Sequence, residues 1–237
     1  MANRHSDDRD GEEADLRWLH PDALARTQEG AARAERAERT AAMREAMERA
    51  ALELSGEVGY GRMTVAALTR RSDSNLDRFY KAYRSKFDCY LTGYEGAIEA
   101  LCERLLAACA EAADWPAGMR AALGELAGFV DAEPSRAKGV FAEVYVAGGA
   151  ALEKRNEVFE RLSRAIDRAR RETTQSRHSP PPITSRFILS AIEATVVRDL
   201  ASGKADDFAA RLPGVLYLAT APYFGRAVAS REARRIG

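Results

Sequence analysis

The sequence predicts an all-α protein of about nine helices, with a small N-terminal helical domain and a larger C-terminal one. Apolar residues recur at the three- and four-residue spacing of helices, and no segment shows the alternation of a half-buried strand. Clusters of Gly, Pro and Asp, among them DWPAG and DAEPSRAKG, are expected to break the chain into separate helical segments. The chain has 237 residues, of which 46% are hydrophobic, so it is long enough to bury a substantial core.

The N-terminal part of the chain begins with twenty polar and charged residues that we expect to be disordered. From about Asp22 to Gly56 the chain is rich in Ala, Glu and Arg, which favours a helix. Met47, Ala50 and Leu54 lie on one side of that helix. We expect a disordered or partly helical extension over residues 1–37 and a first domain over residues 38–86. A second domain would follow over residues 87–230, and a tail over residues 231–237.

Two short helical segments follow, and a tight turn separates them. Thr64 is an N-cap candidate for the first segment and Asn75 for the second, which runs to Tyr83. Asp73 lies in the turn, where Asp tolerates left-handed backbone. Two short helices joined in this way, and braced by the helices on either side, form a helix-turn-helix. The second of them would enter the major groove of DNA.

The charge distribution supports a nucleic-acid contact at this place. The chain carries 36 basic and 36 acidic residues, but Gly61 to Lys86 holds seven basic residues against two acids. Asn and Arg can bond base edges, whereas Lys, Tyr hydroxyls and helix N-termini more often hold phosphates. The residues that we expect to contact DNA are Thr64, Arg71, Asn75, Leu76, Arg78, Tyr80, Lys81, Arg84 and Lys86.

These residues carry a resemblance to a known family. The motifs ALEL, GY, TVAAL, FY and SK follow one another between about Thr40 and Lys86, and this stretch resembles the N-terminal domain of the tetracycline-repressor (TetR) family of transcriptional regulators. CYLTGYEGAIEAL, AEVYVAGGAALEKRNEVFERL and LPGVLYLATAPYFG resemble its actinobacterial-type subgroup, so the resemblance covers roughly residues 40–230. It implies a homodimeric repressor that binds a palindromic operator in double-stranded DNA and responds to a small-molecule effector.

The turn and the second short helix depart from the family pattern. The family usually has Ala-Gly-Val-Ser where this chain has Ser72–Asn75, and Ser74 would leave either a hole or a hydroxyl that needs a partner beneath the turn. Asp77 would place a carboxylate near phosphates, and Ser55 replaces a usual core aromatic. Two interpretations stay open. Either the helix-turn-helix still binds DNA with an altered sequence preference, or the chain is a sensor or protein-partner module. In the second case its helix-turn-helix, called the head below, is degenerate and no longer binds DNA.

The second domain carries aromatic residues on helices that would enclose an effector pocket. The candidates are Tyr90, Tyr94, Phe129, Phe141, Glu143, Tyr145 and Phe159. Aromatic residues at helical spacing are also ordinary core residues, and that alternative stays open. Glu143 lies in an apolar run and needs a partner, for which Arg155 and a cationic ligand are both candidates.

The last two expected helices run from Ile183 to about Leu200 and from Asp206 to about Leu218, and Pro213 should kink or split the second. Their apolar faces together exceed what one helix pair buries, which indicates a dimer. The expected interface residues are Phe187, Ile188, Ala191, Ile192, Thr195, Val196, Leu212, Val215, Leu216, Ala219 and Thr220.

Other classes of protein fit the sequence poorly. The only histidines, His5, His20 and His178, lie in expected tail or loop segments, the last within Thr173–Pro182, so no His pair lies on a helix as a metal site needs. The sequence has no nucleophile elbow and no phosphate loop. We therefore expect no enzyme, metal or cofactor. No apolar run is long enough to span a membrane, and without a signal-peptide pattern we expect a cytoplasmic protein.

Overall fold

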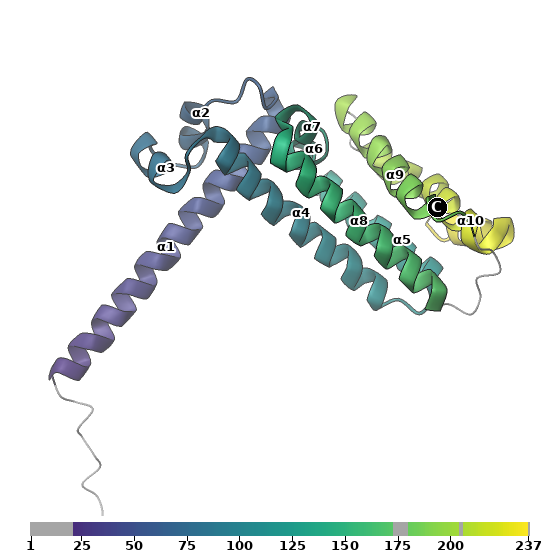
Figure 1. Cartoon of the computed structure of the whole chain (residues 1–237), viewed down its shortest axis with the longest axis horizontal. Coiled ribbons are helices and arrows are strands. Elements are labelled where there is room, and N and C mark those ends of the chain that lie inside the picture. The colour runs from purple at the N-terminus through teal and green to yellow at the C-terminus, as the bar shows by residue number, and fades with distance from the viewer. Residues whose placement is uncertain (1–20, 173–179, 204–205, 237) are drawn as a thin grey trace, which may run out of the picture. The chain divides into compact units, whose positions relative to one another are not determined.

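A computed structural model describes residues 21–172, 180–203 and 206–236. These residues form ten α-helices and no strand, which confirms the all-α prediction (Figure 1). The disorder expected for the first twenty residues, most of the expected loop at Thr173–Pro182 and all three histidines lie outside the described residues. None of the helices in the described ranges is long and apolar enough to cross a bilayer.

The helices differ in length from five to 38 residues. In chain order they are α1 (Pro21–Val58), α2 (Val65–Arg71), α3 (Leu76–Ala82), α4 (Lys86–Ala110), α5 (Trp115–Ala132), α6 (Pro134–Phe141), α7 (Glu143–Ala147), α8 (Gly149–Glu172), α9 (Thr184–Ala201) and α10 (Asp206–Ala233).

The helix α6 is the reason for a tenth helix where the sequence indicated about nine. The segment DAEPSRAKG was expected to be a break, but Pro134 stands in the first turn of α6. Proline suits the first helical position, because its missing N–H has no partner within the helix there. The sequence rule that reads proline as a breaker therefore failed at a helix start.

The helix α1 passes from one compact unit, residues 1–44, into the second, residues 45–237. In the first unit, residues 29–42 are exposed on every side. The Arg39 guanidinium and the Glu35 carboxylate form an i,i+4 pair there at 2.6 Å. In the second unit, Met47, Ala50 and Leu54 are buried, as the helical spacing predicted.

The helices α2 and α3 form the expected helix-turn-helix. The Thr64 hydroxyl caps α2 by accepting the Ala67 N–H at 3.2 Å. Asn75 Oδ1 caps α3 by accepting the Arg78 N–H at 2.9 Å. Asp73 has φ 48°, so it adopts the left-handed backbone that the sequence indicated for the turn.

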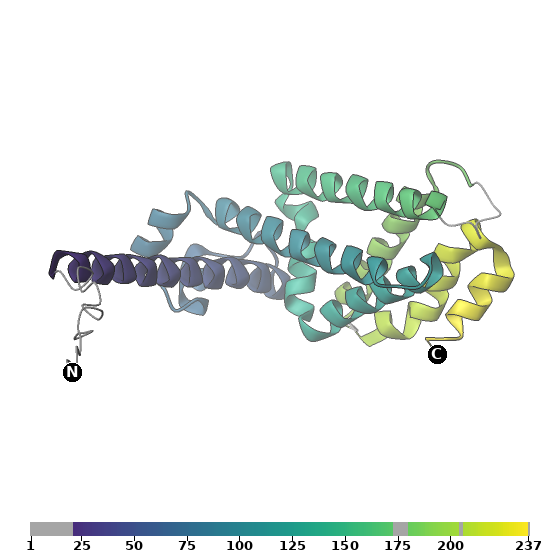
Figure 2. The same ribbon diagram turned by 90° about the horizontal axis from the view of Figure 1, so that it is seen from below.

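The larger part of the second unit packs around α5. The helices α4 and α8 run beside one another, α5 packs against α4 and α10, and α9 packs against α8 and α10 (Figures 1 and 2). Trp115 at the start of α5 contacts Tyr223 and Phe224 of α10, with each pair of ring centroids 5.2 Å apart. This aromatic cluster packs the N-terminal end of α5 against α10.

The break in α10 does not lie at Pro213. The helix continues through Pro213 and Pro222, and its backbone leaves the helical conformation at Gly225, with φ 79° and ψ 170°. A residue with a side chain would be strained in that conformation, whereas glycine adopts it readily. The chain then returns to helix as far as Ala233, and the buried Glu232 pairs with Arg120 of α5.

Candidate nucleic-acid interface and effector cavity

The helix α3 exposes the side chains that a reading helix needs. Phe79 is fully buried beneath it, whereas Leu76, Arg78, Tyr80 and Lys81 are exposed. The Tyr80 ring packs edge-on against Phe79, with the centroids 5.3 Å apart, so its hydroxyl is held at the surface of the small domain. The expected base-contacting side of α3 is therefore uncovered by the described residues.

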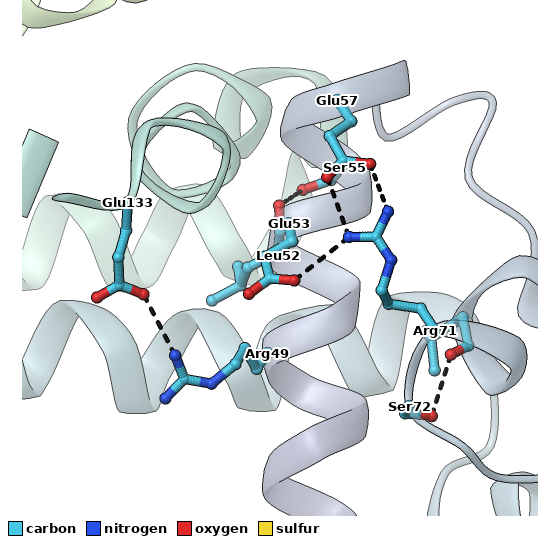
Figure 3. Close-up of polar contacts among 9 residues, drawn as sticks. Arg49, Leu52, Glu53, Ser55, Glu57, Arg71, Ser72 and Glu133 are labelled. Atoms are coloured by element: carbon cyan, nitrogen blue, oxygen red, sulfur yellow. Dashed lines mark hydrogen bonds and ion pairs between the residues drawn. The ribbon is translucent and has the colours of Figure 1, made fainter. Parts of the chain in front are cut away.

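Several basic residues of the head already have partners within the chain. Arg71 forms a two-pronged pair with Glu57 at 2.7 and 3.0 Å and also reaches Glu53 at 3.4 Å (Figure 3). The hydrogen bonds from Arg71 lower the pKa of the Glu57 carboxyl. Lys81 Nζ lies 2.7 Å from Asp77 Oδ2 on the same helix. Arg71 thus joins α2 to α1, and Asp77 offsets the charge of Lys81.

Lys86 has a structural task that the sequence did not indicate. Its ammonium group donates to the carbonyls of Tyr60, Gly61 and Met63 at 3.0, 3.2 and 3.0 Å. It also lies 4.8 Å from the centre of the Tyr60 ring. All three ammonium hydrogens are used in this way, so Lys86 fixes the loop between α1 and α2 and is not available to donate to a phosphate.

The basic residues of the head that have no partner within the chain are the better candidates for DNA contacts. Arg70, Arg78 and Arg84 are exposed, and their side chains have no partner among the described residues. Asn75 uses its carbonyl oxygen as the cap of α3, which leaves its amide N–H groups for a base or phosphate. Arg78 therefore stands out, because it combines a free guanidinium with a position on the exposed side of α3.

The expectation for Ser74 is confirmed. Its hydroxyl oxygen is buried beneath the turn and has no hydrogen-bond partner within the described residues. A buried hydroxyl without a partner costs about 1–3 kcal/mol. The turn therefore carries a local cost to folding.

The helices α1 and α6 cross closely within the second unit, just before α1 leads into the helix-turn-helix. A Cβ added to Gly56 would lie 1.9 Å from the Ser135 carbonyl oxygen, and one added to Gly139 would lie 2.2 Å from that of Leu52. Ser55 also faces Gly139, and an aromatic ring at this position would push α6 away. The departure from the family pattern at Ser55 thus makes the close crossing possible.

Polar contacts reinforce the crossing. Tyr90 donates its hydroxyl to the Gly139 carbonyl at 2.7 Å. Arg49 of α1 reaches Glu133 at the start of α6 at 3.3 Å (Figure 3). Glu143 accepts the backbone N–H of Tyr60 at 2.8 Å. The partner of Glu143 is therefore a backbone amide of the head, and neither expected candidate, Arg155 or a cationic ligand, is needed to explain its burial.

Most of the expected pocket residues belong to the packed interior. Tyr90 and Tyr94 are buried and stacked, with their ring centroids 6.2 Å apart, and Phe129 packs against Phe141. Tyr145 is about half exposed and donates to Glu193 at 2.8 Å. Burial and that hydrogen bond raise the pKa of Tyr145 to about 12.

Two cavities lie elsewhere in the same unit. The larger, of about 430 Å³, is lined by α4, α5, α8 and α9, is open to solvent at one part, and contains none of the expected pocket residues. The smaller, of about 60 Å³, is lined by Phe141 and Phe159 among others. Five residues line both cavities, namely Leu105, Leu126, Leu162, Leu189 and Ile192. The two cavities therefore adjoin.

Comparison with known proteins was made on sequence and on structure. Models of known protein families do not match the chain, and no curated sequence is similar to it. Solved structures do match. FadR from Bacillus subtilis, solved in complex with stearoyl-CoA, superposes with a TM-score of 0.65 at 18% identity, over 73% of this chain and 96% of that one.

Two further structures agree. The fatty acid degradation regulator FadR from Bacillus halodurans has a TM-score of 0.64 at 15% identity, over 73% of this chain and 96% of that one. A TetR family transcription regulator from Marinobacter aquaeolei VT8 has a TM-score of 0.64 at 15% identity, over 80% of this chain and 99% of that one. The chain has the TetR-type fold.

Within this TetR-type fold, the expected dimer residues divide into two groups. Seven are buried within the protomer: Ile188, Ile192, Val196, Leu212, Leu216, Ala219 and Thr220. The other four, Phe187, Ala191, Thr195 and Val215, are exposed or half-buried. Leu218, which was not expected, is 68% exposed and Phe187 is 72% exposed. The spacing of apolar residues thus identified residues on two faces of these helices. It did not distinguish the face that packs in the core from the face at the surface.

Sequence reasoning also missed the charged residues inside the larger domain. Glu193 is buried and accepts Arg155 Nε at 3.0 Å, and the Arg155 guanidinium lies 3.7 Å from the centre of the Phe159 ring. The run ILSAIEATVV contained the signal, because a lone carboxylate among apolar residues needs a partner. The described residues contain no cluster of three side chains that could hold a metal ion.

Proposed function

We propose that this protein is a ligand-responsive transcriptional regulator, a repressor that binds a palindromic operator as a homodimer. The observation that carries the proposal is the exposed side of α3, which is capped, supported by Phe79 and left uncovered within a helix-turn-helix. The likeness to solved regulators agrees with it, and so does the cavity of about 430 Å³ in the larger domain.

In this proposal Arg78 is the principal base-reading residue, with Asn75 and Leu76 beside it. Tyr80, Arg84 and the N-terminus of α2 at Thr64 would hold phosphates. Lys81 would contribute charge that Asp77 partly offsets. Arg71 and Lys86, by contrast, would act indirectly, because they hold α2 and the loop before it in place.

The effector would change operator binding by changing the separation of the two heads. The smaller cavity touches Phe141 at the end of α6, and Gly139 of the same helix meets α1 beneath the head. A ligand that moves α6 would therefore move α1. Such a coupling needs two states that the ligand and the operator prefer differently.

A second candidate function is a sensor or protein-partner module that no longer binds DNA. The observations that favour it are the unpartnered Ser74 hydroxyl beneath the turn and the carboxylate of Asp77 on the exposed side of α3. Both work against a well-formed, electropositive reading head. The two candidates differ in one property that can be measured, which is affinity for duplex DNA.

The first experiment is selection of fragments from sheared genomic DNA by the purified protein at two salt concentrations. A regulator should enrich one palindromic fragment, and its affinity should fall steeply with salt because counterions are displaced from the phosphates. Arg78→Ala should weaken binding to that fragment by about ten-fold or more and relax the preference at one base pair of each half-site.

The matched control is Arg168→Ala, which removes an exposed arginine of α8 outside the head. It should leave the affinity for the fragment unchanged. If a folded protein enriches no fragment at either salt concentration, the regulator proposal fails and the sensor or partner module takes its place.

A further inference from the structure

The larger cavity exists because small residues face one another across it. The helix α8 contributes Ala165 and Ala169, and the helices α4 and α5 contribute Ala110 and Ala122. Larger side chains at these positions would fill the space. A cavity of about 430 Å³ falls in the range that holds drug-sized ligands, and most of its lining is aliphatic.

The charged lining of this cavity has one sign. Asp114 and Glu172 line it, and no Lys, Arg or His does so among the described residues. Asp114 precedes α5, and one of its carboxylate oxygens accepts the Ala117 N–H at 2.8 Å. Glu172 ends α8. An anionic ligand would meet two carboxylates here and no cation among the described lining residues, whereas a cationic ligand would be attracted to the carboxylates.

An aromatic residue adds to this preference. Trp115 follows Asp114, lines the same cavity and is held by its packing against Tyr223 and Phe224. Indole is the side chain that attracts cations best through its ring face, and aromatic residues recognise quaternary ammonium groups in this way. One part of the cavity thus combines an indole with carboxylates, as a bulky cationic head would require.

The remainder of the cavity suits an apolar body. The five residues shared with the smaller cavity are all Leu or Ile. Beyond them the smaller cavity holds one carboxylate, Glu193, which Arg155 and Tyr145 already occupy. The space that continues from the acidic part is therefore apolar and without unpaired charge, so it favours an extended hydrocarbon or aromatic body.

We propose that the effector is an amphiphilic cation, with an ammonium or quaternary ammonium head at Asp114, Trp115 and Glu172 and an apolar body that extends toward the smaller cavity. This inference rests on the proposed function in one respect, since it names the class of effector for that regulator. It requires only binding in the larger cavity, and no contact with DNA.

The test is calorimetry on the full-length protein without DNA. Two probes share the same ten-carbon chain, decyltrimethylammonium and decanoate, both used well below the concentrations at which they form micelles. Decyltrimethylammonium should bind about ten-fold or more tightly than decanoate at pH 7.5, since about 1.4 kcal/mol of head-group preference gives that ratio. Equal affinities, tighter binding of decanoate, or no binding of decyltrimethylammonium would overturn the proposal.

Variants locate the site. Asp114→Asn keeps the helix cap, because Asn caps as well as Asp, and combined with Glu172→Gln it should reduce the affinity for decyltrimethylammonium about ten-fold and bring it close to that for decanoate. Glu111→Gln, at the end of α4 and outside the cavity lining, is the matched control and should change neither affinity. Cation binding that survives the double substitution unchanged would place the head elsewhere and overturn the assignment.

The experiment separates the two proposals. A protein that prefers the cation but enriches no DNA fragment would retain this inference and lose the regulator function. A protein that enriches an operator but prefers decanoate, or binds neither probe, would retain the regulator and lose this effector class. Ala165→Phe, which places a ring in the cavity, should abolish binding of the cation and so confirm that the ligand enters it.

Discussion

At the scale of single residues, the head uses its charges largely within itself. Thr64 and Asn75 could be identified as helix caps from the sequence, because a cap depends on neighbours three residues away. Lys86 could not be assigned in the same way. Its three carbonyl partners lie 23 to 26 residues earlier, and only the folded loop brings them together. The same holds for Arg71, whose carboxylate partners lie on α1.

The Ser74 hydroxyl leads to a prediction about stability. Ser74→Ala removes a buried polar group that has no partner, so we expect the free energy of unfolding to rise by about 1 kcal/mol. For a chain of this size the melting temperature should rise by about 2–4 °C, measured by circular dichroism.

Ser72 provides the control for this prediction. Its hydroxyl donates to the Leu68 carbonyl at 3.0 Å (its contact with α2 is drawn in Figure 3), so Ser72→Ala should lower the melting temperature or leave it unchanged. An increase of equal size in both variants would contradict the assignment of the gain at Ser74 to its unpartnered hydroxyl.

At the scale of elements, the sequence predicted which segments are helical better than where they meet. The caps, the turn at Asp73 and the apolar spacing of α1 are local properties, and the structure confirms them. The start of α6 at Pro134 and the continuation of α10 through Pro213 were not foreseen. In both cases the effect of proline on the helix depends on its position in the helix and on the packing around it. The spacing of apolar residues reports neither.

The crossing of α1 and α6 leads to a prediction at this scale. Gly139→Ala places a methyl group against the backbone of Leu52, so we expect the free energy of unfolding to fall by about 2 kcal/mol or more. Chemical denaturation followed by circular dichroism would measure the change.

Gly128→Ala is the matched control, because Gly128 lies within α5 and nothing approaches within 4 Å of an added Cβ. This substitution should stabilise the protein by about 0.5–1 kcal/mol, as alanine favours helix over glycine. Destabilisation of similar size in both variants would argue against a special close contact at Gly139.

At the scale of the whole molecule, the sequence indicated the class of the fold but not the position of its cavity. The fold class could be predicted because helical periodicity and the order of the motifs are both visible in a single sequence. The cavity depends instead on where small residues such as Ala110, Ala122 and Ala165 fall once the helices have packed, which periodicity does not report. The sequence pointed to aromatic residues. Of these, Tyr90, Tyr94 and Phe129 are buried in the core, whereas Phe141 and Phe159 line the smaller cavity.

The exposed apolar residues of α9 and α10 lead to a prediction about assembly. Phe187 and Leu218 are 72% and 68% exposed on α9 and α10, the two helices where the sequence indicates the dimer interface. We expect the protein to sediment as a dimer, and Phe187→Glu combined with Leu218→Glu to raise the dissociation constant of that dimer about a hundred-fold or more. Sedimentation velocity over a range of concentrations would measure it.

Val146 offers a comparison for this double variant. It is 62% exposed on α7, away from α9 and α10 in the chain, so Val146→Glu should leave the dimer intact. A wild-type protein that sediments as a monomer at micromolar concentration would contradict the dimer directly.

The direct backbone contacts at Gly56 and Gly139 bear on how a movement of α6 would be transmitted to α1. Contacts made by long side chains absorb small movements, because each side chain can change its rotamer. Here the added Cβ of Gly56 would lie 1.9 Å from a carbonyl oxygen, so no flexible atom stands between the helices. A displacement of α6 toward α1 meets backbone atoms rather than a flexible side chain, so we expect it to move α1. A ligand that shifts α6 only slightly would then reposition the head by nearly the same amount.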